Sequence, residues 1–168
     1  EGKSVVAPLA IQGGQKPDNW TVLWHNGVPF LVWEYKKDPA EPAPLPRVDS
    51  QQMKKFFGQL CDYLQCLKSY YGLRFAFGVL STYNRWYICW LDGSDGAANS
   101  TSLKDKIWTE PAVKPHKLHP SPDRLINYCE YSYCDPDLPK VLTSLVKKAY
   151  SSPLDRICEE QLTSPGRL

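Results

Sequence analysis

The sequence predicts an α/β domain in which a central mixed β-sheet is flanked by helices. Segments rich in β-branched and aromatic residues alternate along the chain with segments of helical periodicity. The length of 168 residues fits one compact core. Hydrophobic residues make up 42% of the chain and aromatic residues 12%, which argues against a disordered protein. Because the formal net charge is only +2, any binding to nucleic acid has to depend on a local basic surface.

The first predicted element is a hairpin of two strands. Residues 20–25 and 30–35 are rich in β-branched and aromatic side chains, and Asn26-Gly27 between them is a tight-turn signal. Residues 1–16 show little periodicity, so we interpret them as a lead-in segment before a domain that begins at residue 17.

A helix is predicted over residues 50–71. Asp49 or Ser50 can cap its start, and Gly72 is suited to end it. The four prolines between residues 38 and 48 disfavour a helix there and predict an extended connection. Apolar side chains recur at three- and four-residue steps and define the face expected to pack on the sheet: Met53, Phe56, Phe57, Leu60, Leu64 and Leu67.

Two further strands are predicted at residues 73–81 and 86–91, as a second hairpin. From residue 97 to 120 the sequence predicts one short strand, Ile107-Trp108-Thr109, and otherwise loop, because prolines interrupt the segment.

The sequence Asp135-Pro136-Asp137 is expected to open a last helix that ends near Ser151-Ser152-Pro153. The domain is therefore predicted to cover residues 17–152, and residues 153–168 are expected to form a tail or a linker to a further domain.

Cysteine spacing and hydropathy indicate a soluble chain in a reducing compartment. The six cysteines form no CxxC pair, and the first three lie in predicted helix or strand, where buried thiols are common. A domain stapled by disulfides is the alternative, but a chain of this length and aromatic content does not need them. No apolar run approaches the roughly 20 residues needed to cross a bilayer, and residues 1–4 lack the organisation of a signal peptide. We therefore expect no association with a membrane.

The candidate catalytic residues lie at the open end of the first hairpin. Pro17-Asp18 precedes the first strand, and Glu34-Tyr35-Lys36 ends the second. Because side chains alternate along a strand, Glu34 and Lys36 share one face. An ideal two-residue turn would set Asp18 opposite Tyr35, on the other face. Convergence of the three residues therefore requires a bulge or a twist at Asp18.

These residue types suit the hydrolysis of phosphodiesters. Asp18 and Glu34 supply hard oxygen ligands for Mg²⁺ or Mn²⁺, and the backbone carbonyl of Tyr35 is a third candidate ligand. Lys36 can orient or deprotonate the attacking water, or stabilise charge on the phosphoryl oxygens. If its ammonium reaches solvent or phosphate, Lys36→Ala should change the stability by no more than about 0.5 kcal/mol. An ExK triplet alone also occurs by chance, with its charges simply solvated.

Pro17-Asp18, Glu34-Tyr35-Lys36 and the strand-strand-helix-strand order resemble the PD-(D/E)XK nuclease superfamily over residues 17–92. In addition, Gln59 and Tyr63 match the QxxxY element of RecB-like members, where these residues support the site or the bound nucleic acid. The polar face of an ordinary helix is the alternative interpretation. The resemblance implies a restriction-endonuclease-like core and an endonuclease or exonuclease that depends on Mg²⁺ or Mn²⁺, with DNA favoured over RNA.

Residues 77–86 are similar to the second hairpin of nuclease-like modules in Crinkler-type effectors. This narrower resemblance implies action inside a host cell, with the nucleus as one compartment, and an adjoining kinase-like domain outside this chain. Superfamily members usually add an acidic residue from a helix before the first strand, whereas only Glu1 stands upstream here. Either that helix lies outside this chain, or the site is degenerate. The second explanation favours the alternative function, a module that binds nucleic acid or protein without cleaving it.

Two other constellations remain open. His116, His119, Cys129 and Cys134 are possible zinc ligands, although their spacing is not a standard one. A basic, aromatic-bearing surface for a phosphate backbone is predicted from Lys104, Lys106, Trp108, Lys114, Lys117 and Arg124, with a plain solvated face as the alternative. The sequence contains no GxSxG nucleophile motif, P-loop or dinucleotide-binding glycine pattern.

Overall fold

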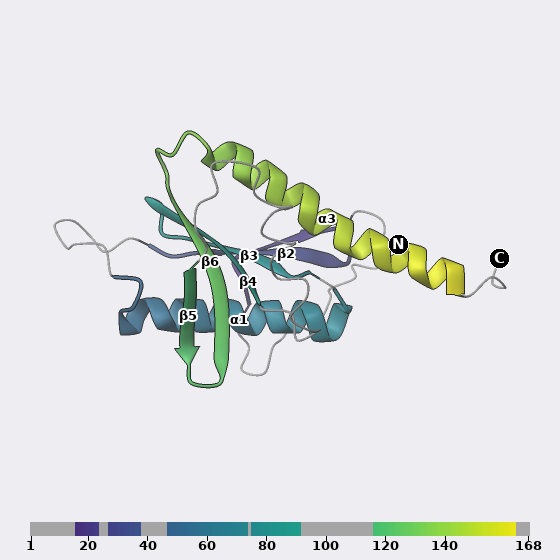
Figure 1. Ribbon diagram of the computed structural model, residues 1–168, viewed down its shortest axis with the longest axis horizontal. Helices are drawn as coiled ribbons and strands as arrows, with labels where there is room; N and C mark the ends of the chain where they lie inside the picture. Colours follow the sequence, from purple (N-terminus) through teal and green to yellow (C-terminus); the bar gives the residue numbers. More distant parts are fainter. Residues whose placement is uncertain (1–15, 24–26, 38–46, 74, 92–115, 164–168) are drawn as a thin grey trace, which may run out of the picture.

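The computed structural model describes residues 16–23, 27–37, 47–73, 75–91 and 116–163, with side chains up to residue 150. They form an α/β fold in which a six-stranded mixed sheet lies between two helices, as Figure 1 shows. This confirms the predicted fold class. The helices are α1 (Gln51–Tyr71) and α3 (Leu138–Thr163). The strands are β1 (Asn19–Val22), β2 (Pro29–Tyr35), β3 (Phe77–Ser81), β4 (Arg85–Leu91), β5 (His116–Ser121) and β6 (Arg124–Ser132).

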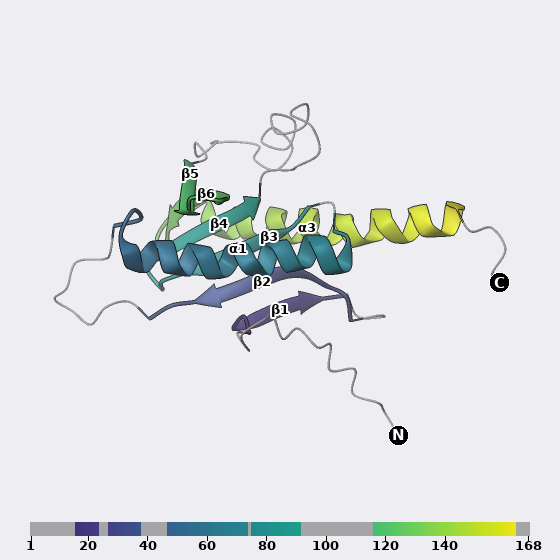
Figure 2. The ribbon, with the colours of Figure 1, turned by 90° about the horizontal axis from the view of Figure 1, so that it is seen from below.

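The strand order in the sheet is β1-β2-β3-β4-β6-β5, which places β1 at one edge and β5 at the other. Strands β2 and β3 are parallel and are connected through α1, whereas every other neighbouring pair is antiparallel. Seen from below in Figure 2, α1 runs across the sheet, and α3 lies on the far side. Both helices therefore cover the sheet, one on each face.

Helix α1 begins and ends where the sequence predicts. The hydroxyl of Ser50 accepts a hydrogen bond from the backbone N–H of Met53 at 3.2 Å, which caps the first turn. Gly72 has a φ of 60°, the left-handed conformation that glycine adopts without steric cost, and its N–H caps the last turn. The predicted apolar face is buried on the sheet, except that Phe56 is only half-buried.

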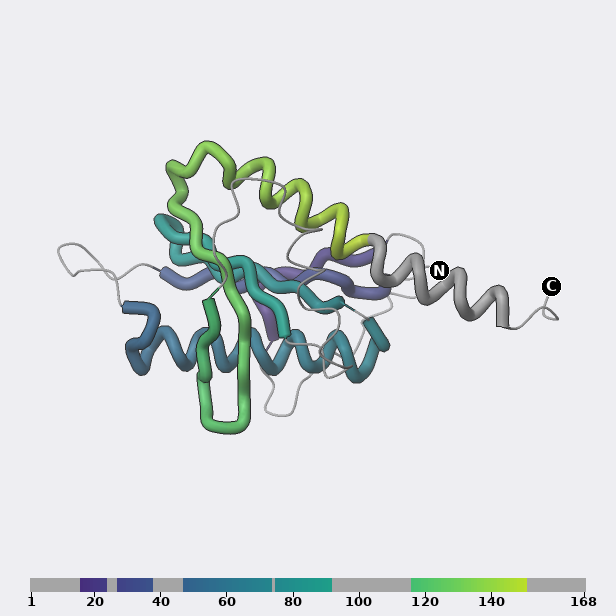
Figure 3. Tube along the Cα trace, in the orientation of Figure 1, coloured from purple at the N-terminus to yellow at the C-terminus, as the bar shows by residue number. Residues whose placement is uncertain are grey.

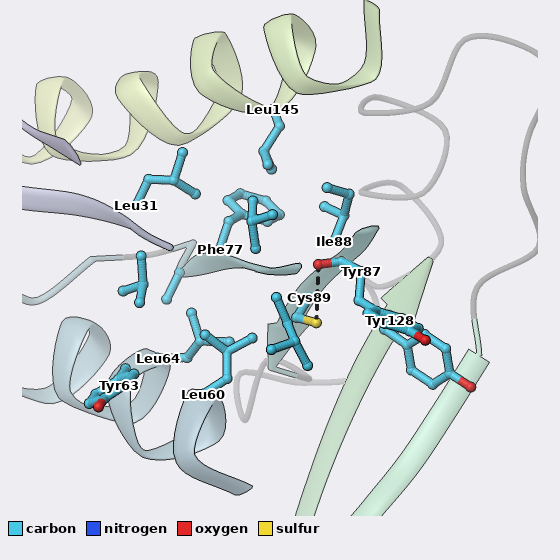
Figure 4. Close-up of a cluster of buried hydrophobic side chains, with 14 of the residues drawn as sticks. Leu31, Leu60, Tyr63, Leu64, Phe77, Tyr87, Ile88, Cys89, Tyr128 and Leu145 are labelled. Carbon is cyan, nitrogen blue, oxygen red and sulfur yellow. Dashed lines mark hydrogen bonds between the residues drawn. The ribbon is translucent and has the colours of Figure 1, made fainter. Parts of the chain in front are cut away.

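The core lies on both faces of the central strands. In Figure 4, Leu60 and Leu64 of α1 approach the sheet from one side, and Leu145 of α3 approaches from the other. All three are fully buried. The fit is closest at Gly78 of β3, where a Cβ atom would lie only 2.8 Å from the Cδ1 atom of Leu60. The glycine therefore allows α1 to pack tightly on β3.

The prediction of loop up to residue 120 is wrong for residues 116–120, which belong to β5, and β6 was not predicted. The two strands form an antiparallel hairpin that crosses α1 (Figure 3). Pro120, which suggested a loop, lies where the pairing of β5 with β6 shifts between Leu118 and Ser121. A proline is tolerated at such an irregularity because no ladder hydrogen bond is required of it there. The predicted strand at residues 107–109 lies outside the described residues.

Helix α3 starts as predicted, and the carboxylate of Asp135 accepts a hydrogen bond from the backbone N–H of Asp137 at 2.9 Å. Its predicted end near residues 151–153 is wrong, because the helix continues to Thr163. A proline inside a helix removes one backbone donor, but this helix passes through Pro153 without ending. No helix in the described ranges is both long and apolar enough to cross a membrane.

Candidate active site

The pairing of β1 with β2 brings Asp18 opposite Glu34. The backbone N–H of Leu23 donates to the carbonyl of Val28 at 2.9 Å, so Leu23 faces Val28 across the hairpin. An ideal two-residue turn at Asn26-Gly27 would instead set Leu23 opposite Phe30. Gly27, the one described residue of the predicted Asn26-Gly27 turn, has a φ of 66°. If this pairing continued unchanged along both strands, Asp18 would oppose a residue whose side chain lies on the face opposite that of Glu34.

A β-bulge at Phe30 corrects the register. Val22 pairs with Pro29 but Thr21 pairs with Leu31, so Phe30 is the extra residue on β2. Its ring is buried and makes an edge-to-face contact with Tyr150 of α3 at 5.8 Å between ring centroids. After the bulge, Asn19 pairs with Trp33, and the same register sets Asp18 opposite Glu34. The required bulge is therefore present, although it lies near the turn and not at Asp18.

Asp18 and Glu34 are joined by reciprocal contacts. The backbone N–H of Asp18 donates to Glu34 Oε2 at 3.3 Å. In return, Asp18 Oδ2 accepts a hydrogen bond from the backbone N–H of Tyr35 at 2.6 Å. Glu34 is 1% exposed, whereas Asp18 is exposed to solvent. The pair thus forms a site with a buried carboxylate below and an accessible carboxylate at its rim.

Lys36 neutralises the buried carboxylate. Its Nζ atom forms an ion pair with Glu34 Oε1 and a 3.3 Å hydrogen bond with Gln59 Oε1 of α1. The same ammonium lies 5.2 Å from the centroid of the Phe56 ring, a cation–π contact. Only 19% of the Lys36 side chain is exposed. The small stability change expected for Lys36→Ala depended on an ammonium that reaches solvent or phosphate, whereas here the ammonium is paired with a buried carboxylate. With this partner removed, we expect a larger loss of stability.

Gln59 and Tyr63 extend the site onto α1. They are one helical turn apart, and Gln59 Nε2 donates to the hydroxyl oxygen of Tyr63 at 2.9 Å. This bond leaves the carbonyl oxygen of Gln59 facing Lys36. Burial raises the pKa of Tyr63, and the negative charges of Glu34 and Asp18 raise it further, so its hydroxyl stays protonated.

Two aromatic residues that contact the site were not predicted to belong to it. Trp20 of β1 lies on the same face as Asp18, and its ring meets Tyr63 edge-on at 6.1 Å between centroids. Phe56 precedes Gln59 by three residues and so shares its side of the helix. Both positions could have been found from the alternation of β1 and the helical spacing of α1, once Asp18 and Gln59 were chosen.

Tyr35 stands apart from the other site residues. Alternation along β2 turns its side chain to the face opposite Glu34, and the residue is 48% exposed. Burial of its inner part raises the pKa of Tyr35, and the nearby Asp18 raises it further. Its backbone remains next to the site, because its N–H contacts Asp18. The candidate ligand of Tyr35 is thus its carbonyl oxygen.

The donor set consists of hard oxygens from Asp18, Glu34 and the Tyr35 backbone, the ligand types that Mg²⁺ and Mn²⁺ prefer. Among the described residues, no cluster of three or more His, Cys, Asp or Glu side chains could hold a metal. Mg²⁺ commonly keeps several waters and binds through one or two carboxylates together with phosphate oxygens, so the oxygen types of these three residues are compatible with such an ion.

Within the described ranges, the four candidate zinc ligands do not form a group of three or more that could hold a metal ion. Cys129 is fully buried in β6, whereas Cys134 is exposed after the end of that strand. His116 stacks on Tyr128, and His119 Nδ1 lies 3.1 Å from the carbonyl oxygen of Arg124. Within the described residues none of the cysteines forms a disulfide.

Only part of the predicted basic surface is described. Lys104, Lys106, Trp108 and Lys114 lie outside the described residues. Arg124 forms an ion pair with Asp62 of α1 and so helps to fasten the β5–β6 hairpin to that helix. It borders an open hollow of about 520 Å³ that Lys54 and Lys55 of α1 also line.

Comparison of the chain with protein-family models, with curated proteins and with solved structures found no match. The geometry and chemistry of the site therefore carry the functional argument.

Proposed function

We propose that this protein hydrolyses nucleic-acid phosphodiester bonds in a reaction that needs Mg²⁺ or Mn²⁺, with a site of the PD-(D/E)XK type. The observation that supports the proposal is the hydrogen-bonded set of Asp18, Glu34, Lys36 and Gln59, assembled from β1, β2 and α1. These are the residues that the sequence pattern selects, and the bulge in β2 sets Asp18 opposite Glu34.

Each residue has a role that its position allows. Asp18, at the exposed rim, and Glu34, below it, would hold the metal together with the Tyr35 carbonyl. When bound, the metal would polarise the phosphate and lower the pKa of a bound water. Lys36 would orient that water or stabilise the charge on the phosphoryl oxygens. Gln59 holds the Lys36 ammonium in place, and Tyr63 fixes the orientation of the Gln59 amide.

The first test measures metal binding. Mn²⁺ should raise the melting temperature of the wild type, because a ligand that binds only the folded state stabilises it by mass action. Asp18→Asn should abolish this shift, since it removes the exposed ligand. Glu130→Gln provides a matched control, because Glu130 is also a strand carboxylate in an ion pair, with Arg85 at 3.0 Å. Equal shifts in all three proteins would refute the proposed metal site.

The second test measures cleavage of single- and double-stranded DNA and RNA. Glu34→Gln and Lys36→Met should each lower the rate on the order of a hundredfold or more, while Glu130→Gln should leave it unchanged. Cleavage that persists unchanged in both site variants would assign the activity to other residues.

One observation favours a second candidate, a degenerate module that binds without cleaving. Both carboxylate oxygens of Glu34 already have donors within the protein, from the Asp18 N–H and the Lys36 ammonium. Because these donors already compensate the negative charge of Glu34, the site does not need a metal ion to do so. Retained nucleic-acid binding with no cleavage at any divalent metal concentration would select this candidate.

A further inference from the structure

Two exposed tyrosines form a stacked pair near the candidate active site. Tyr83 lies in the turn between β3 and β4, and Tyr133 directly follows β6. Their rings are nearly parallel, with an interplanar angle of 11° and centroids 5.8 Å apart. The residues are 71% and 58% exposed. Because the rings cover each other only in part, the pair presents flat aromatic surface to solvent.

The backbone at Tyr83 is held in a conformation that disfavours tyrosine. Its φ is 68°, in the left-handed region, which costs a residue with a Cβ atom roughly 1–2 kcal/mol relative to glycine. A hydrogen bond from the Tyr83 N–H to Ser81 Oγ, at 3.2 Å, fixes the turn. A second, from the Tyr133 N–H to the Asn84 carbonyl at 2.8 Å, ties the two tyrosine segments together. Glycine or asparagine would fit this position better, so the ring itself needs an explanation.

The stacked pair lies at the same end of the sheet as the candidate catalytic residues. Ser81 pairs with Tyr35 across the parallel strands β2 and β3, and its carbonyl accepts a hydrogen bond from the Lys36 N–H at 2.7 Å. Tyr83 follows Ser81 by two residues, a stretch of chain that spans at most about 7 Å. A strand of nucleic acid whose phosphate lies at Lys36 could therefore reach this pair with a neighbouring base.

We propose that Tyr83 and Tyr133 form a stacking platform for an unpaired nucleobase, so that the substrate is single-stranded next to the cleaved bond. This inference rests on the proposed nuclease function. Aromatic side chains stack on bases of any sequence, and a base inside an intact duplex has no free face to offer. The platform contacts the base rather than the backbone, because Asp135 and Asp137 follow Tyr133 closely and would repel phosphate.

The test is binding of a fluorophore-labelled oligothymidylate, measured by anisotropy in EDTA so that no metal-dependent cleavage occurs. Tyr83→Gly removes the ring and relieves the backbone strain, so the melting temperature should stay within about 3 °C of the wild type. Its affinity should fall on the order of tenfold, whereas Tyr83→Phe should bind like the wild type. Tyr70→Ala is the matched control, because Tyr70 is 81% exposed but lies in the last turn of α1.

Unchanged affinity in Tyr83→Gly, equal losses in Tyr83→Gly and Tyr70→Ala, or tighter binding of a blunt duplex than of the single strand would overturn the platform. The absence of single-strand binding by the wild type would overturn it as well. Failure of the nuclease proposal is distinguishable: the wild type would then bind the oligonucleotide through Tyr83 but cleave nothing when Mg²⁺ or Mn²⁺ is added.

Discussion

The ion pair between Lys36 and Glu34 connects the candidate site to the stability of the fold. Glu34 is 1% exposed, and both of its oxygens have donors within the protein. We predict that Lys36→Met destabilises the protein, because it leaves a negative charge buried next to an apolar side chain.

The magnitude follows from the surroundings of the pair. Removing one partner of a fully buried ion pair costs about 3–5 kcal/mol. Lys36 is 19% exposed, and the Asp18 N–H remains bonded to Glu34 Oε2, so water and this donor compensate part of the loss. We therefore expect a loss of about 2 kcal/mol, which lowers the melting temperature by about 4–8 °C for a chain of this size.

The assay is urea and thermal unfolding of a double-mutant cycle. Adding Glu34→Gln to Lys36→Met removes the unpaired charge while keeping an acceptor for the Asp18 N–H, so the double variant should regain at least about 1 kcal/mol. Arg47→Met is the control, because the Arg47–Asp49 ion pair is solvent-exposed and its loss should not change the melting temperature. A fully stable Lys36→Met, or additive losses in the double variant, would refute the coupling.

Three further predictions concern the scaffold and are checked by equilibrium unfolding. Ser50→Ala removes the cap on α1 and should cost about 1 kcal/mol, whereas Ser50→Asp, which retains a capping oxygen, should cost less. Gly78→Ala should destabilise the protein by about 1–2 kcal/mol, because the new Cβ atom would lie 2.8 Å from Leu60. Gly58→Ala should stabilise α1 by about 0.5–1 kcal/mol, because its Cβ atom would make only an ordinary contact at 3.6 Å. Effects of the same sign in the two variants would contradict this packing. Burial raises the pKa of Tyr87 to about 12 in the folded protein, so this tyrosine ionises first in the unfolded chain as the pH rises above 10. The free energy of unfolding should therefore fall between about pH 10 and 12, and Tyr87→Phe should reduce this fall.

The elements predicted correctly from the sequence are those whose signals are local. Helix α1 combines apolar spacing with a capping serine and a terminal glycine, and no other part of the chain is needed to interpret these signals. The first hairpin and the shared face of Glu34 and Lys36 follow from alternation within a single strand. The convergence of Asp18 could only be stated as a requirement, because the bulge at Phe30 involves packing against Tyr150, which lies far along the chain.

The elements that were missed depend on long-range contacts. Strand β5 contains two histidines and a proline and has no strand-like composition, but it pairs with β6 over α1 and is fastened there by the Arg124–Asp62 ion pair. Helix α3 continues through Pro153, although a proline usually marks a boundary. In both cases an element contains a proline that disfavours it locally, and contacts with the rest of the fold outweigh this preference. Such contacts cannot be deduced from a single sequence.

Three features that cost stability lie at one end of the sheet. A carboxylate is buried at Glu34, a tyrosine occupies a left-handed position at Tyr83, and the hydroxyl of Thr82 is buried with no hydrogen-bond partner among the described residues. Each feature lowers stability relative to an apolar residue or a glycine at that position. Helix α1, which follows the local rules, supplies the rigid support against which Lys36 is held through Gln59. Since natural sequences tend to break such rules at functional sites, these three features support, independently of any motif, the proposal that the functional site lies where β2 and β3 end.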